Sequence, residues 1–274
     1  MKEHWIGGNS MNIVLRELRS YRKALIIWSV CIIIFTAMAF AKYAGFAAMG
    51  SEANELLESL PDFMKNAFGL SSLNLTEIKG YYSVLFMYYA LITGIHAVML
   101  GATIISKEAR DKTADFLMVK PISRSSMITS KIIVGFIDVL IINIVTGLTT
   151  IVFVNINNNG ESITGGLING MVVLLIIQCI FFSLGLAISS FTGKAKKATT
   201  ISTGIILIMY FLDVFRNISD KLDFVKYITP FSYFDIIKVL NGNGFEALYI
   251  VLSIIIIVVS IVLTYTNYQR KDIL

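Results

Sequence analysis

Residues 167–191 read LINGMVVLLIIQCIFFSLGLAISSF, a run of 25 residues without one charged side chain. A transmembrane α-helix needs about 20 consecutive, mostly apolar residues, so this run alone is long enough to cross a bilayer. Five other segments share its character, and they lie at 24–44, 82–105, 132–154, 198–215 and 247–266. The sequence therefore predicts an all-α membrane protein with six transmembrane helices.

Charged residues avoid these six segments. Of the 23 Lys and Arg and the 18 Asp and Glu in the chain, only Lys42, Asp138 and Asp213 lie within them. A charge at the bilayer centre costs about 2.5–3.5 kcal/mol on the insertion scale. Lipid offers no hydrogen-bond partner to backbone groups, so a segment that spans the bilayer is expected to be a helix. The chain has 56% hydrophobic and only 15% charged residues, whereas soluble domains have about 25% charged residues. This composition excludes an ordinary water-soluble enzyme, a disordered regulator and a nucleic-acid-binding domain.

The positions of Lys and Arg predict the orientation. Sixteen of the 23 fall in the two ends of the chain and in alternate loops, at 1–23, 106–131, 194–197 and 267–274. By the positive-inside rule both termini then face the cytoplasm. We divide the chain into an N-terminal cytoplasmic segment (1–23), a six-span domain (24–266) and a cytoplasmic tail (267–274).

Residues 12–23 have the pattern of an amphipathic interfacial helix. Val14, Leu18, Tyr21 and Leu25 share one helical face, and the opposite face carries Arg16, Arg19 and Lys23. A basic amphipathic stretch directly before a span lies in the headgroup plane. It acts either as a lipid anchor or as a lever that also contacts a cytoplasmic partner.

Two outer segments also have helical character. In 45–81, apolar residues recur at helical spacing, and Pro61 suits the first turn of a second short helix that ends near Gly69. Its apolar face rests on the bilayer or the bundle, or forms a substrate gate. In 217–246, Thr229–Pro230 starts a helix that Gly242 stops. That helix is apolar but too short to span, which predicts an interfacial or re-entrant helix before the last span.

The cytoplasmic loop 106–131 contains four adjacent apolar residues, Phe116 to Val119, which Pro121 ends. Ser106 can cap a short helix, predicted to precede them, that carries Glu108, Arg110 and Asp111. Exposed apolar residues need a partner surface, which is either the bundle itself or another protein.

Catalytic motifs are absent from the sequence. The nearest approach to a phosphate-binding loop is Gly193–Lys194, but Ile188 and Ala195 occupy the positions of the first glycine and the Ser/Thr. No zinc motif or nucleophile elbow appears, so we expect no metal site and no cofactor on this chain.

Several polar residues lie inside the spans. Asp138 lies near the cytoplasmic end of the third span, whereas His96 and Gln178 lie deeper. Such groups face the bundle interior or water. They make either interhelical hydrogen bonds or, through Asp138 and His96, a proton or ion relay.

Five segments are informative together: RELRSYRKALIIW (16–28), LPDFMKNAFG (60–69), ISKEARDKTADFLMVKPISRSSMITSK (105–131), ITPFSYFD (228–235) and YTNYQRKDIL (265–274). Through them, in this order and with six spans, the chain resembles an ABC-2 type permease, the membrane subunit of a bacterial ATP-driven exporter. The third departs from the usual pattern at Ala109, where a second acidic residue is common, and at Lys112, where glycine is common.

The resemblance implies a pair of permeases, identical or not, above two ATPase subunits that carry the ATP and Mg²⁺. It also implies that the loop forms a cytoplasmic coupling helix docking into the ATPase, through Glu108, Arg110, Thr113, Phe116, Leu117 and Val119. Relatives of this shape export peptide antibiotics, drugs, lipids or ions, and we expect an antimicrobial or other hydrophobic compound. The alternatives are an ion-coupled secondary transporter using Asp138 and His96, and an intramembrane enzyme.

Overall fold

A computed structural model describes residues 3–67, 70, 73–106, 124–157 and 163–270. Within these ranges every regular element is a helix, and six helices are long and apolar enough to span a membrane. They are α1 (Glu3–Met49), α4 (Ile78–Ile104), α7 (Arg124–Asn157), α8 (Thr164–Thr192), α9 (Ala195–Ile218) and α11 (Ala247–Arg270). The predicted fold class and its six spans are confirmed.

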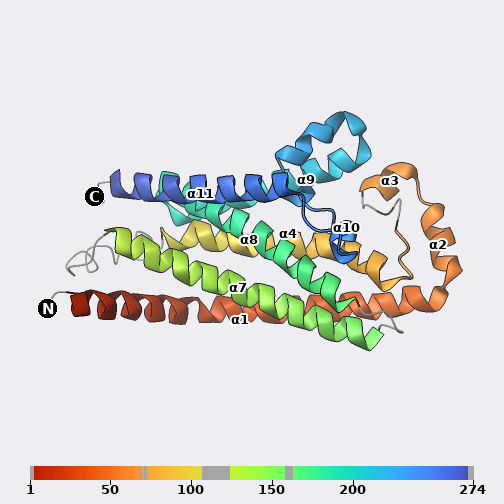
Figure 1. Ribbon diagram of the computed structural model, residues 1–274, viewed down its shortest axis with the longest axis horizontal. Coiled ribbons are helices and arrows are strands. Elements are labelled where there is room, and N and C mark those ends of the chain that lie inside the picture. Colours follow the sequence, from red (N-terminus) through yellow and green to blue (C-terminus); the bar gives the residue numbers. More distant parts are fainter. Residues whose placement is uncertain (1–2, 68–69, 71–72, 107–123, 158–162, 271–274) are drawn as a thin grey trace.

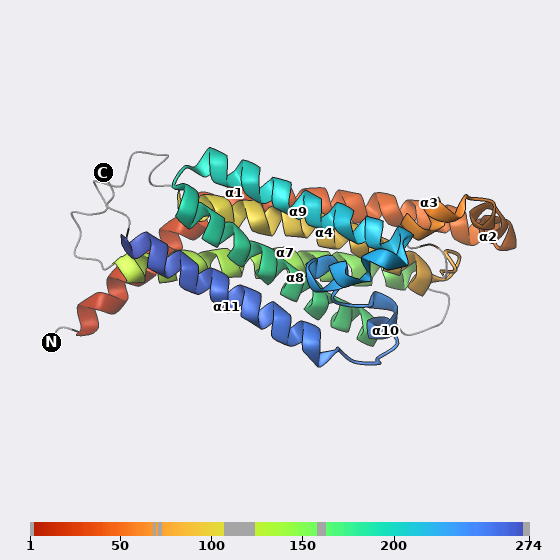
Figure 2. The same cartoon turned by 90° about the horizontal axis from the view of Figure 1, so that it is seen from above.

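The six long helices run side by side along the long axis of the molecule (Figures 1 and 2). α4 and α8 are the most buried and form the centre. α9 packs on both, α11 packs on α8, and α1 packs on α7. Both termini lie at one end of the bundle, and the short elements α2 (Ser51–Glu58), α3 (Asp62–Ala67) and α10 (Ile236–Leu240) lie at the other.

Glycines bring α4 and α8 into backbone contact. A Cβ atom built on Gly185 would lie 2.3 Å from the carbonyl oxygen of Val98 and 2.9 Å from the amide nitrogen of Ala102. A Cβ on Gly101 would lie 2.2 Å from the carbonyl oxygen of Phe182. Small residues drive helix association in membranes because backbones can approach closely. These two glycines therefore set the spacing of the central helix pair.

A buried hydroxyl network joins three helices in the middle of the bundle. The Tyr89 hydroxyl of α4 donates to Thr36 Oγ1 of α1 at 2.9 Å and accepts from Thr150 Oγ1 of α7 at 3.3 Å. All three side chains are buried. Hydrogen bonds between transmembrane helices are worth about 0.6–2 kcal/mol each, so this network ties α1 and α7 to the centre.

The N-terminal segment differs from its prediction as a separate helix. α1 continues without a break through residues 12–23 into the first span, and Figure 2 shows its first turns projecting past the bundle toward the N-terminus. Arg16, Arg19 and Lys23 are exposed, as the amphipathic pattern predicts. The opposite face packs on the hydrophobic core through Val14, Leu18 and Tyr21, so this part of the face is covered by protein.

The second short outer helix predicted at Pro61 is present as α3, which begins at Asp62. The predicted end at Gly69 lies outside the described residues. The single helix predicted from Pro230 to Gly242 is wrong. The chain forms 3₁₀ turns at η1 (Asp220–Tyr227) and η2 (Pro230–Ser232), and then α10.

The physical reason is Asp235. Its carboxylate accepts hydrogen bonds from the backbone N–H groups of Ile237 and Lys238, which caps a new helix and breaks the predicted one. The predicted stop at Gly242 is confirmed, since this residue has φ of 77° just after α10.

We expect Gly185→Ala to lower the unfolding temperature of the purified protein, because the added methyl group would overlap the α4 backbone. Overpacking of this kind costs about 1–3 kcal/mol. The matched control is Gly204→Ala in α9, where no atom lies within 4 Å of the new Cβ. Thermal unfolding followed by size-exclusion chromatography compares the two variants, and equal midpoints would contradict the close contact.

Candidate functional site

The six residues to which the resemblance assigns ATPase coupling, Glu108 to Val119, lie outside the described residues. The structure does describe the helices that lead into and out of this loop. α4 ends at Ile104, and α7 begins at Arg124. The contacts between these two helices therefore decide how the loop is held.

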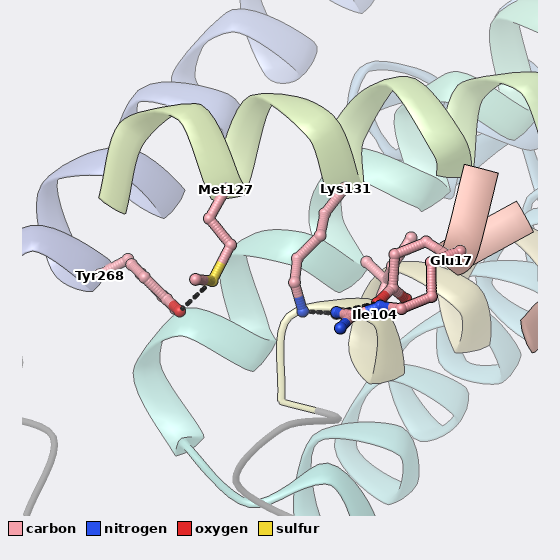
Figure 3. Close-up of polar contacts among 6 residues, drawn as sticks. Glu17, Ile104, Met127, Lys131 and Tyr268 are labelled. Carbon is pink, nitrogen blue, oxygen red and sulfur yellow. Dashed lines mark hydrogen bonds and ion pairs between the residues drawn. The ribbon is translucent and has the colours of Figure 1, made fainter. Parts of the chain in front are cut away.

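Lys131 of α7 caps the end of α4. Its Nζ atom donates a hydrogen bond to the carbonyl oxygen of Ile104 at 2.6 Å, and its side chain is only 1% exposed. Figure 3 shows the side chain reaching from α7 to this helix end. The last four carbonyls of a helix lack partners within it, and a cation there also interacts favourably with the helix dipole. The ammonium thus fixes the point where the chain leaves α4.

Other polar contacts gather at this end of the bundle. Glu17 of α1 is buried and forms an ion pair with Arg16 at 3.4 Å. The Tyr268 hydroxyl of α11 lies 3.5 Å from Met127 Sδ of α7 (Figure 3). Helices α1, α4, α7 and α11 all therefore contribute polar or sulfur contacts around the ends of the loop.

His96 and Asp138, placed at different depths by the sequence, lie together between α4 and α7. His96 Nε2 is 3.3 Å from Asp138 Oδ1, and both side chains are buried. The distance fits an ion pair, but the two groups are not aligned for a hydrogen bond. The indole of Trp28 on α1 packs edge-on against the imidazole, with ring centroids 5.2 Å apart. The pair is therefore closed off on one side by an aromatic ring.

Gln178 of α8 is fully buried, and within the described residues neither its amide nitrogen nor its amide oxygen has a hydrogen-bond partner. A buried amide left unpaired costs about 1–3 kcal/mol. The structure does not bring Gln178 into a described contact with His96 or Asp138. The three predicted intramembrane residues thus divide into one pair and one isolated amide.

Ion pairs on the outer surface differ from the buried pair of His96 and Asp138, because their carboxylates are exposed. Lys65 lies 2.8 Å from Asp62, and its hydrogen bond lowers the pKa of that carboxyl group. Lys226 lies 2.5 Å from Asp223, whose hydrogen bond raises the pKa of the ammonium. Asp62 and Asp223 are well exposed to solvent. Exposed pairs contribute little stability, so we do not count them as parts of a site.

Sequence reasoning missed Lys131, because it grouped this residue with the solvated charges of the loop. The signal was its position directly before the apolar run Ile132–Val134, within one turn of the third span.

The sequence analysis also treated Gly193–Lys194 only as a failed phosphate-loop pattern. Gly193 has φ of 66° and ends α8, and its N–H bonds the Ser189 carbonyl, so a tight turn joins α8 to α9.

Among the described residues, no group of His, Cys, Asp and Glu is arranged to hold a metal ion. The described polar contacts at this end link α4 with α7 and α7 with α11.

The sequence matches the family described as ABC-2 family transporter protein over residues 11–273. No curated protein matches it. The family match includes all six spans and both helices that flank the loop. Permeases of this family are membrane transport components and not the ATPases themselves. This chain belongs to the ABC-2 transporter family.

Proposed function

We propose that this chain is the permease subunit of an ATP-binding cassette exporter, which moves a substrate out of the cell with energy from ATP hydrolysis by a separate ATPase subunit. The observation that carries the proposal is the family match over all six spans. Two copies, or two related chains, would form the pathway. ATP and Mg²⁺ would be held by the ATPase.

We assign the coupling between the ATPase and the permease to the loop between α4 and α7. The two helices that flank it are joined at two levels, by Lys131 with the Ile104 carbonyl and by His96 with Asp138. A push on the loop therefore moves both helices as one unit. Glu108, Arg110 and Thr113 would orient the ATPase contact, and Phe116, Leu117 and Val119 would supply its apolar part.

We infer from the charge distribution that both termini face the cytoplasm, and the proposed exporter would lie in the bacterial plasma membrane. Both termini lie at the same end of the bundle, which supports this arrangement (Figure 1). The basic face of Arg16, Arg19 and Lys23 at that end would contact anionic lipid headgroups. Exposed apolar side chains such as Ile27, Met38 and Ile208 suit contact with lipid or with the second permease.

The substrate class that we propose is an antimicrobial peptide, a drug or another hydrophobic compound. The described outer elements are short and form no large extracellular domain. A substrate would therefore be selected within the membrane or at its surface.

The contact of His96 with Asp138 favours one alternative, an ion-coupled secondary transporter. In that case a proton gradient alone would drive transport in vesicles that lack the ATPase, and Asp138→Asn would abolish it. In an ATP-driven exporter, transport would require the ATPase and ATP. The two proposals are separated by assaying one reconstituted preparation with each energy source.

We expect a membrane-impermeant maleimide to label Asp223→Cys in intact cells and not Lys196→Cys, because these residues lie at opposite ends of the bundle. Both are exposed, so access to reagent is decided by the membrane side. The background is Cys31→Ser with Cys179→Ser, since both cysteines are free. Permeabilised cells should label both positions, and labelling of Lys196→Cys in intact cells would reverse the orientation.

We expect Phe116→Asp to weaken the complex with the ATPase by a factor of ten or more. Burial of one such side chain contributes about 1.5–3 kcal/mol, and 1.4 kcal/mol corresponds to a factor of ten. Glu108→Ala should keep the complex but lower transport, because a charge at an interface rim mainly sets orientation. Copurification of the ATPase measures the first effect. If Phe116→Asp leaves the complex and its ATPase activity unchanged in inserted protein, the loop packs only on its own bundle.

We expect Lys131→Met to leave the ATPase bound but to reduce the amount of substrate moved per ATP hydrolysed at least fivefold. The variant keeps the length of the side chain and removes the donor that holds the end of α4. The control is Lys197→Met, an exposed lysine in the first turn of α9. Lys131→Arg should restore part of the coupling. Equal transport per ATP in Lys131→Met and wild type would contradict the role of this contact.

A further inference from the structure

A cavity of about 320 Å³ lies at the outer end of the bundle. Its walls are one face of α4, the last turns of α9 and the segment Phe231–Ile237, with Leu73 at its edge. Figure 1 shows these elements together at the end opposite the two termini. The size is at the lower end of the range for small-molecule sites in proteins. None of the features assigned to coupling lies in this cavity.

The cavity is polar toward the outer surface and apolar toward the membrane interior. Asn217 and Arg216 lie at the outer end of α9, and Asp213 lies five residues, roughly 8 Å, before the end of that helix. On α4 the lining continues inward to Ala90, which lies roughly 18 Å from the start of the helix at Ile78. The deep wall is apolar. A ligand that fits has a polar head facing outward and an apolar body facing inward.

Two carboxylates provide hydrogen-bond acceptors on the polar wall. The Asp213 carboxylate accepts a short hydrogen bond from Ser232 through Oδ1, and Asp235 uses its Oδ1 to cap α10. In the described part of the chain, the second oxygen of Asp213 has no hydrogen-bond donor, and the second oxygen of Asp235 has only the Lys238 ammonium at 4.0 Å. Arg216 donates through Nη2 to Asn217, and its Nε lies 3.5 Å from Asp213 Oδ1 as an ion pair without a hydrogen bond.

The charges on the wall favour a cation. Asp213, Asp235 and Arg216 are the charged residues among the described lining, which gives two negative charges to one positive. The Lys238 ammonium lies 4.0 Å from the Asp235 carboxylate and 3.8 Å from the Glu246 carboxylate, so it interacts with both. The rings of Phe86, Phe231 and Phe234 also line the cavity. Aromatic faces attract cations through the quadrupole of the ring.

We propose that this cavity binds an amphipathic amine, with its ammonium group at Asp213 and Asp235 and its apolar body along Phe86, Met87 and Ala90. An ammonium group has three donors and no acceptor, which complements the two carboxylates on the wall. Binding requires neither the ATPase nor a second permease. Failure of this inference would therefore leave the proposed function untouched.

The test uses the full chain in phosphatidylcholine nanodiscs and three probes with the same fluorescent body. Dansylcadaverine carries a primary ammonium, its N-acetyl derivative is neutral, and dansyl-6-aminohexanoate carries a carboxylate. Binding is followed by the blue shift of dansyl fluorescence, with empty nanodiscs subtracted. We expect the amine to bind at least tenfold more tightly than the other two. Equal or tighter binding of the neutral or anionic probe would overturn the proposal.

Variants then locate the site. Asp213→Asn and Asp235→Asn should each weaken binding of the amine about tenfold, and asparagine at position 235 can still cap α10. Arg216→Gln should leave binding unchanged or tighten it. The matched control is Asp223→Asn, which removes an exposed carboxylate outside the cavity.

If Asp213→Asn fails to fold, the rim variant Asp235→Asn decides the question, because its side chain is exposed. Ala90→Leu provides a separate check, since it fills the deep end without changing charge and should weaken the amine as well. Wild-type binding by Asp235→Asn and Ala90→Leu, or loss of binding in Arg216→Gln, would show that the amine does not occupy this cavity.

Discussion

The backbone contact between α4 and α8 is the constraint on which the rest of the bundle depends. Because Gly101 and Gly185 each face the backbone of the other helix, these two helices cannot move apart or rotate without losing their closest packing. Lipid gives helices no hydrophobic reason to associate, so close packing and polar contacts must hold them together. α9, α11 and α7 all pack on this pair, and their positions follow from it.

Polar side chains then tie the outer helices to the centre at three depths. Lys131 holds the end of α4 near the termini, the Tyr89 hydroxyl network and the pair of His96 with Asp138 lie deeper, and Ser232 bonds Asp213 near the opposite end. Each contact joins segments distant in the sequence. In a medium that offers no competing partner, such contacts determine which helices lie together, and their number limits how freely α1 and α7 can move relative to α4.

The fold was largely predictable from the sequence, and the contacts were not. Spans could be located because length and lack of charge are read along a single segment, and α3 and the stop at Gly242 follow from Pro and Gly chemistry. The predicted helix from Pro230 failed because Asp235 is a strong N-cap in its interior. His96 and Asp138 were assigned to different depths because depth was counted from predicted ends. α7 begins at Arg124, eight residues before its predicted start, whereas α4 ends at Ile104, next to its predicted end. The tilt of one helix against another has no signature in either segment.

The left-handed residue Gly193 has a consequence for how the bundle can change shape. It joins α8 to α9 through so short a turn that neither helix can slide along the other by a full turn of 5.4 Å. α4 is fixed to α8 by the glycine contact, so the movement that the turn itself leaves open to α9 is a rotation about Gly193. The far end of α9 lies at the outer surface, where Asp213 and Arg216 line the same cavity as Ser83 and Phe86 of α4. Rotation of α9 by a few degrees would widen or narrow this cavity, while the end of α9 next to Gly193 would hardly move.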